Sequence, residues 1–153
     1  MEIEQQIQSE DGRILILRVQ VDNLKLVCAN IYTPNDTRFH ITFIRHVQNL
    51  LQQFSGENII VASGFNCPFA KDDKEGGRDL SSKKNVVAKV KLLLSSLDLE
   101  DIWRKLHPND KQFTWRTRDQ KIKCRLDHRL VSKHLLRQSP VCKCHTVNQK
   151  DLL

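Results

Sequence analysis

The chain has 153 residues, of which 39% are hydrophobic, and it contains five Gly and four Pro. These values indicate one globular domain over residues 1–153 and exclude a disordered or fibrous chain. The formal net charge is +7 and the pI is near 9.3, which favours an anionic partner. No run of about 18 apolar residues is present, so a membrane span is excluded.

The N-terminal half predicts a β-hairpin, a helix and a buried strand. Residues 13–20 and 24–31 are rich in Ile, Leu and Val and are separated by a short polar turn, as in an antiparallel hairpin. Asp36 is a suitable N-cap for a helix that ends near Phe54, with apolar residues at helical spacing. Residues 58–62 form a short apolar strand.

The C-terminal half continues the alternation of helices and strands. Residues 68–82 form a polar segment without periodicity, which predicts a loop. Apolar residues at helical spacing predict a helix over 83–97, and a helical turn is expected over 101–106. Three further strands are expected over 113–116, 123–131 and 140–145, the first two joined by a basic turn at 118–120. The alternation predicts a single α+β domain.

Four short motifs end in polar residues at the ends of predicted strands. They are Asn30-Ile31-Tyr32-Thr33-Pro34-Asn35, Ser63-Gly64-Phe65-Asn66, Thr114-Trp115-Arg116 and Arg125-Leu126-Asp127. In this order they resemble the motifs of the endonuclease/exonuclease/phosphatase family. The segments 97–104 and 113–116 are similar to the endonuclease domains of non-LTR (LINE-like) retrotransposons.

The resemblance implies a partial four-layer α/β-sandwich of the DNase I-like type, and it begins near Gly12. The opening third of the family, which supplies strands and metal-binding residues, has no match in this sequence. We therefore expect a domain that lacks its opening strands and that associates with itself through an unpaired sheet edge. Glu2 and Glu4 precede no predicted buried strand and do not replace the missing ligands.

The resemblance also implies roles for individual residues. Tyr32, Asn66 and Asp127 correspond to catalytic positions, but Gly64 stands where the family has the Asp that orients the attacking water. The family uses Mg²⁺, and Thr114 corresponds to its DNA-facing rim. Each residue also has a simpler explanation, as a strand-end aromatic, a turn amide, a surface ion pair or a strand residue.

The last family motif, Ser-Asp-His, corresponds to Lys150, Asp151 and Leu152, so only Asp151 survives as a weak metal-ligand candidate. Loss of a general base or an electrostatic stabiliser typically costs about 100- to 10,000-fold in rate. Because several such groups are missing, the sequence predicts a degenerate endonuclease-like domain without productive Mg²⁺ binding. An active nuclease completed by another chain is the remaining catalytic alternative.

The positive charge is concentrated between residues 104 and 137, where eleven Lys and Arg against three Asp give a net +8. A cluster of this kind predicts contacts with DNA or RNA phosphates, and a solvated basic face is the alternative. The nucleic-acid-binding candidates are Thr114, Arg116, Arg118, Lys121, Lys123 and Arg125. Trp115 is expected in the core.

The five Cys are odd in number and no apolar leader precedes the domain, which predicts a nuclear or cytoplasmic protein that is not secreted. Cys142, Cys144 and His145 form an alternative constellation that could bind zinc together with Cys124 or His128. Alternation in this segment also fits a strand with both thiols facing inward.

Overall fold

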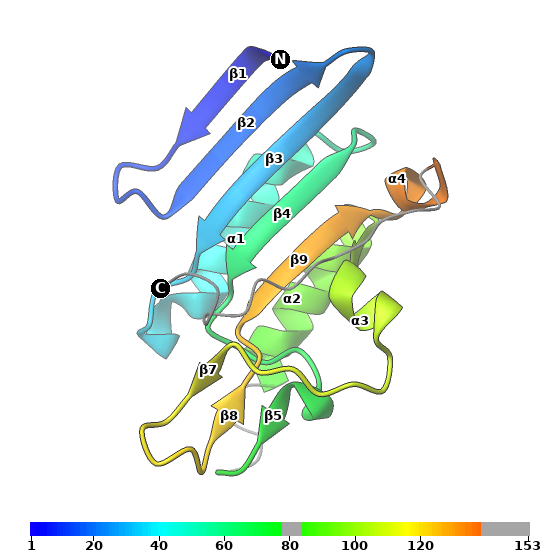
Figure 1. The fold of residues 1–153 in the computed structure, drawn as a ribbon. Coiled ribbons are helices and arrows are strands. Elements are labelled where there is room, and N and C mark those ends of the chain that lie inside the picture. Colours follow the sequence, from blue (N-terminus) through cyan, green and yellow to red (C-terminus); the bar gives the residue numbers. More distant parts are fainter. Residues whose placement is uncertain (78–83, 139–153) are drawn as a thin grey trace.

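The computed structural model describes residues 1–77 and 84–138 and contains two sheets (Figure 1). The larger sheet has six strands in the order β1-β2-β3-β4-β9-β6. Their bounds are β1 Glu2–Gln8, β2 Ile14–Val21, β3 Leu24–Tyr32, β4 Ile59–Gly64, β6 Leu99–Asp101 and β9 Asp127–Ser132. The helices α1 (His40–Gln52) and α2 (Lys84–Ser96) lie together against one face of this sheet. The predicted α+β class is confirmed.

Alternation along the central strands decides which face of the sheet the helices cover. In β2, Ile14 and Ile16 are 1% exposed and face the helices, whereas Leu15 and Leu17 are half-buried on the opposite face. The predicted hairpin is present, since β2 and β3 pair antiparallel. β3 then pairs parallel with β4, and α1 makes the crossover between them.

The two long helices bury the apolar stripes that their sequences predict. Val47 and Leu51 of α1 and Val90 and Leu93 of α2 are at most 1% exposed and belong to one core. Asp36 does act as a cap, but of a short 3-10 turn, η1 (Thr37–Phe39), that precedes α1. The helix therefore begins one turn later than the periodicity alone suggests.

The smaller sheet has the order β5-β8-β7, with β5 Lys74–Glu75, β7 Trp115–Arg116 and β8 Lys123–Cys124. The predicted single strand 123–131 is wrong, because it is divided into β8 and β9, which belong to different sheets. The break falls at Arg125, which lies between β8 and β9. Its backbone N–H donates to the carbonyl oxygen of Asp73 at 2.8 Å and not to a strand of the large sheet.

The segment predicted as a loop over 68–82 also has structure in its described part. It contains a 3-10 turn, η2 (Lys71–Asp73), followed by β5, and the side chain of Asp73 is fully buried. Two short helices, α3 (Ile102–Leu106) and α4 (Lys133–Gln138), flank β6 and β9. The expected strand 140–145 lies outside the described residues.

The outer strand β1 was not predicted from the sequence. It pairs antiparallel with β2 and carries Glu2 and Glu4 at the edge of the sheet. Its side chains are mostly exposed, so the strand has no apolar run to signal it. Within residues 1–77 and 84–138, no helix is long and apolar enough to cross a membrane.

Candidate functional site

The strand register places three of the motif residues in one row on the uncovered face of the large sheet. Tyr32 at the end of β3 pairs with Gly64 at the end of β4, and Gly64 pairs with Asp127 at the start of β9. Directly paired residues point to the same face, so Tyr32 and Asp127 flank Gly64. The sequence motifs therefore meet at one end of the central strands β3, β4 and β9.

Gly64 leaves little room between its two neighbours. A Cβ atom at this position would lie 3.1 Å from Cδ2 of Tyr32 and 3.3 Å from Oδ1 of Asp127. The row consequently holds one carboxylate. Any side chain added at position 64 would contact both the aromatic ring and that carboxylate.

Asn66 lies in the turn that follows β4 and adopts a left-handed backbone conformation with φ of 50°. Its side-chain amide donates to the carbonyl oxygen of Thr33 and, at 3.0 Å, to Oδ1 of Asn35. The hydroxyl of Tyr32 donates to the same Asn35 oxygen at 3.4 Å. Tyr32 and Asn66 thus meet through Asn35, a motif residue to which the sequence assigned no role.

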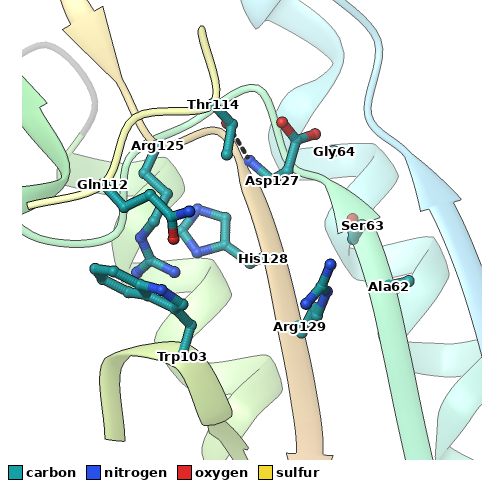
Figure 2. A pocket seen from close by; sticks show the side chains of 10 residues that line it. All are labelled: Ala62, Ser63, Gly64, Trp103, Gln112, Thr114, Arg125, Asp127, His128 and Arg129. Carbon is teal, nitrogen blue, oxygen red and sulfur yellow. Dashed lines mark hydrogen bonds between the residues drawn. The ribbon is translucent and has the colours of Figure 1, made fainter. Parts of the chain in front are cut away.

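Thr114 fixes the other end of the row. Its Oγ1 accepts hydrogen bonds from the backbone N–H of Leu126 at 3.0 Å and from that of Asp127 at 3.2 Å. Figure 2 shows the second of these bonds. The predicted rim residue is exposed, as expected of a rim, and it also holds the backbone that presents Asp127. Thr114 is therefore a positioning residue for this carboxylate.

A cavity of about 280 Å³ lies beside the row, across the start of β9. Figure 2 shows Trp103, Gln112, Arg125 and His128 gathered on one side of β9, with Gly64 and Ser63 in the neighbouring strand β4 on the other. The lining residues are Ala62, Ser63, Gly64, Trp103, Gln112, Thr114, Arg125, Asp127, His128 and Arg129. The cavity therefore joins the predicted row to residues that the motifs did not single out.

Arg125 is not a surface residue, because it is 2% exposed and lies within a network of ion pairs. Its Nε donates to Oδ1 of Asp73 at 2.8 Å, and its Nη2 donates to Oδ2 of Asp101 at 2.8 Å. Arg104 donates to the same Asp73 oxygen at 2.7 Å. Arg125 was predicted to bind phosphate, but its Nε and Nη2 atoms both donate to protein carboxylates.

The two carboxyls stay ionised although they are buried. Burial alone raises the pKa of Asp101, but the hydrogen bonds from His128 and Arg125 outweigh it and hold that pKa well below its usual range. The pKa of Asp73 is likewise lowered, because bonds from Arg125 and Arg104 outweigh its burial. The network therefore contains two cations and two anions that balance each other.

Aromatic rings enclose the network. The rings of His128 and Phe69 stack with centroids 3.6 Å apart, and Nδ1 of His128 lies 3.1 Å from Oδ2 of Asp101. The Arg125 guanidinium lies 4.9 Å from the Trp103 ring centroid. Sequence reasoning missed Asp73, Asp101 and Trp103 as parts of this site. The signal available in the sequence was the resemblance of segment 97–104 to the retrotransposon branch.

The basic hairpin β7–β8 divides the predicted nucleic-acid-binding residues into two groups. Arg116, Arg118 and Lys121 are exposed. Lys123 donates to Glu75 at 2.8 Å and is half-buried. The expectation of a core position for Trp115 is wrong, because this ring is 46% exposed on the hairpin. Trp115 and Arg116 are both exposed, so neither face of the edge strand β7 is covered.

The residues of the row supply few ligands for Mg²⁺, the metal that the resemblance implies. Mg²⁺ is octahedral and is usually held by one or two carboxylates together with waters, and the row offers one carboxylate, Asp127, beside an Asn66 amide that donates to the backbone. In the described part of the chain, no three His, Cys, Asp or Glu side chains are grouped to hold a metal ion. Asp151 and the zinc alternative at Cys142, Cys144 and His145 lie outside the described residues.

Comparisons with known proteins agree with this architecture. No protein-family model matches the chain. Its structure is similar to the AP endonuclease LMAP from Leishmania major, with a TM-score of 0.72 and 17% identity over 84% of this chain and 48% of the other. It is also similar to the endonuclease domain of TRAS1, a telomere-specific non-LTR retrotransposon, with a TM-score of 0.63 and 12% identity over 87% of this chain and 57% of that domain. The chain spans about half the length of each of these proteins. It therefore has a DNase I-like fold, shared with an AP endonuclease and with a non-LTR retrotransposon endonuclease domain.

Proposed function

We propose that the chain is a degenerate, retrotransposon-type endonuclease domain that does not hydrolyse phosphodiester bonds. The observation that carries this proposal is Gly64, which lies between Tyr32 and Asp127 where a carboxylate would be required. Hydrolysis needs a positioned water, a cation on the phosphoryl oxygens and a proton for the leaving oxygen. One carboxylate without a metal cannot supply these three functions together.

The direct test is nicking of supercoiled plasmid with Mg²⁺ and then Mn²⁺, using the wild-type chain and Asp127→Asn. We expect both proteins to leave the plasmid as intact as buffer does. Metal-dependent nicking that disappears in Asp127→Asn would instead establish the alternative of an active magnesium-dependent DNA endonuclease. Nicking that starts only when a second polypeptide is added would support completion by another chain.

A second candidate function is non-catalytic binding of DNA or RNA through the hairpin β7–β8. Its support is that three exposed cations, Arg116, Arg118 and Lys121, belong to the same hairpin as the exposed ring of Trp115. Cations release counterions when they meet phosphates, and an exposed aromatic ring can stack on an unpaired base. Thr114 and Lys123 are neighbours of these residues in the chain, whereas Arg125 is held in its ion pair with Asp73.

This candidate predicts a specific salt dependence. Fluorescence anisotropy with labelled duplex DNA, single-stranded DNA and RNA between about 50 and 200 mM salt measures it. Replacing Arg116, Arg118 and Lys121 together by Gln should reduce the slope of log K against log salt by about 2 to 3. A matched control replaces Lys84, Lys89 and Lys91 of α2, which removes the same charge elsewhere. Equal effects of the two triple variants would reject the hairpin as the binding surface.

We further propose that the protein acts in the nucleus or cytoplasm, and that any self-association uses the edge strand β1. Cys28 is a free thiol, which is typical of a reducing compartment. Charged side chains on an edge strand oppose pairing with a second sheet, so Glu2→Gln with Glu4→Gln should increase the sedimentation coefficient at a given concentration. An unchanged monomeric coefficient would rule out β1 as the contact.

A further inference from the structure

We propose that the outer edge of β1, together with a groove between this strand and α1, binds an extended segment of another polypeptide in which apolar and basic residues alternate. The segment adds to the large sheet as a further strand beyond β1. The groove lies on the helix-covered face of the sheet, opposite the face that carries Tyr32, Gly64 and Asp127. The interaction is therefore independent of whether the chain cleaves nucleic acid.

The first support is the open edge of β1. Among the described strands, β1 pairs only with β2, so the backbone groups on its outer side have no strand partner there. The register with β2 shifts between Ile3 and Gln5 and is regular from Gln5 to Gln8. An open edge is a template for an added strand, and the main-chain hydrogen bonds of that strand provide affinity.

The second support is a groove at the end of this regular part. It has a volume of about 510 Å³ and lies between the end of β1, the turn that follows it and α1. Its apolar lining consists of Ile7 and Ile14 from the sheet and Phe43 and Leu50 from α1. In Figure 1, β1 forms the outer border of the sheet while α1 lies behind β3 and β4. The sheet therefore extends beyond the helix on this side.

The geometry of an added strand fits this groove. Ile7 pairs with Ile16, which is 1% exposed against the helices, so Ile7 faces the groove side of β1. A neighbouring strand lies about 5 Å away and places every second side chain on the same face, about 7 Å apart. Alternate side chains of the bound segment consequently lie beside Ile7 and above Phe43. Those side chains are apolar in the segment that binds best.

The third support is the charge along this edge, which is opposite in sign to that of the whole chain. Residues 1–11 contain four Asp and Glu and no Lys or Arg, whereas the chain has a formal net charge of +7. Glu4 and Asp11 are in ion pairs with Lys and Arg side chains. Glu2 and Glu10 are exposed and form no ion pair within residues 1–77 and 84–138. Carboxylates near both ends of β1 favour a basic segment and disfavour a second acidic β1 strand.

The experiment measures fluorescence anisotropy of three labelled heptapeptides with the full chain. The test peptide is Lys-Val-Thr-Val-Thr-Val-Lys, which places its Val side chains on one face of an extended strand. In the second peptide Glu replaces both Lys, and in the third Pro replaces both Thr and so removes two backbone donors. We expect saturable binding of the test peptide and at least tenfold weaker binding of the other two. Absence of saturable binding, or equal binding of the test peptide and either control, would overturn the proposal.

Hydrogen exchange followed by NMR locates the bound test peptide. Main-chain pairing slows the exchange of outward amide protons in β1, whereas a contact between side-chain charges leaves their exchange unchanged. We expect slower exchange in β1 at saturating peptide. Slowing confined to the hairpin β7–β8 would overturn the proposal. Slowing in β1 of the free protein that increases with protein concentration would also overturn it, because a second copy would then occupy the edge.

A first pair of variants tests the groove. Phe43→Ala removes part of its apolar lining and should weaken binding of the test peptide about tenfold. Phe39→Ala is the matched control, because Phe39 is 55% exposed in η1 and does not line the groove, and it should bind as the wild type does. Equal binding by the two variants would overturn the proposal.

A second pair tests the charge and does not depend on a core residue. Glu10→Gln should weaken binding of the test peptide about two- to fivefold, the effect of one exposed ion pair. Asp72→Asn removes an exposed carboxylate of η2 and should have no effect. Both positions are exposed, so both variants are expected to fold as the wild type does. Equal affinities of Glu10→Gln and Asp72→Asn would overturn the assignment of the segment to this edge.

Discussion

Restoring a carboxylate at position 64 should destabilise the domain and should not restore cleavage. The Cβ atom of Gly64→Asp would lie 3.3 Å from Oδ1 of Asp127, so two carboxylates would stand side by side. At a separation of about 4 Å, their repulsion is about 1 kcal/mol in bulk water and about 4 kcal/mol near a protein surface. Asp127 is exposed, so we expect a loss of about 1 to 3 kcal/mol at pH 7.5.

The matched control is Gly64→Asn, which adds the same contact with the Tyr32 ring at 3.1 Å but no charge. Urea denaturation of both variants across pH isolates the repulsion from the steric cost. A neighbouring carboxylate raises the folded-state pKa of the introduced acid. The penalty is therefore full at pH values above that raised pKa and fades as the pH falls toward about 4.

Two results would refute this reasoning. If Gly64→Asp and Gly64→Asn unfold at the same urea concentration at pH 7.5, the carboxylates do not interact and the row is not as tight as its register implies. If Gly64→Asp nicks plasmid with Mg²⁺ while Gly64→Asn does not, a single substitution explains the degeneracy. The proposed loss of several catalytic groups would then be wrong.

Three further predictions concern the buried network and the hairpin. Arg125→Met leaves Asp101 without a guanidinium partner and Asp73 with Arg104 alone, and it should lower the unfolding free energy by about 3 to 5 kcal/mol in urea. Lys123→Met should cost under about 1 kcal/mol, and equal losses would contradict the network. The pKa of Asp101 is lowered on folding, so the stabilisation by its ionised form is present above about pH 4 and is lost as the pH falls below that value. The difference in unfolding free energy between wild type and Asp101→Asn should therefore narrow below about pH 4. A difference in urea titrations that stays constant with pH would argue against an ionised Asp101. Trp115→Ala should change the unfolding free energy by less than about 0.5 kcal/mol, because its ring is 46% exposed. The same variant should weaken single-stranded DNA binding by about 1 to 3 kcal/mol in fluorescence anisotropy. Unchanged binding would show that Trp115 is not part of the nucleic-acid-binding surface.

The row of the site could be predicted because each of its members ends or begins a strand with a recognisable pattern. Tyr32 and Gly64 close apolar strands, so their meeting required only the sheet order. Asp127 opens β9, although the sequence placed it inside a strand over 123–131. The same logic predicted the buried stripes of α1 and α2. Local patterns are sufficient where the relevant contacts repeat along one element.

Contacts across long sequence separations could not be predicted in this way. Arg125 stands in a strongly basic stretch, where an Arg is ordinarily a surface residue. Its carboxylate partner Asp73 lies 52 residues away in a polar segment without periodicity. The prediction that Trp115 lies in the core was wrong for a different reason. Alternation distinguishes the two faces of a strand but does not tell which face another layer covers.

The motif Arg125-Leu126-Asp127 combines a buried residue that stabilises the fold with an exposed carboxylate, and either can be lost without the other. Arg125 points inward and holds η2, β6 and β9 together through Asp73 and Asp101, whereas Asp127 points outward into the row. The absence of a carboxylate at Gly64 affects only the outward side, where it avoids repulsion with Asp127 and so favours the folded state. Loss of Arg125 would instead leave Asp101 without a guanidinium partner and Asp73 with Arg104 alone. A chain of this fold can therefore lose its chemistry by substitutions that cost no stability, and the inward half of the motif is expected to outlast the outward half.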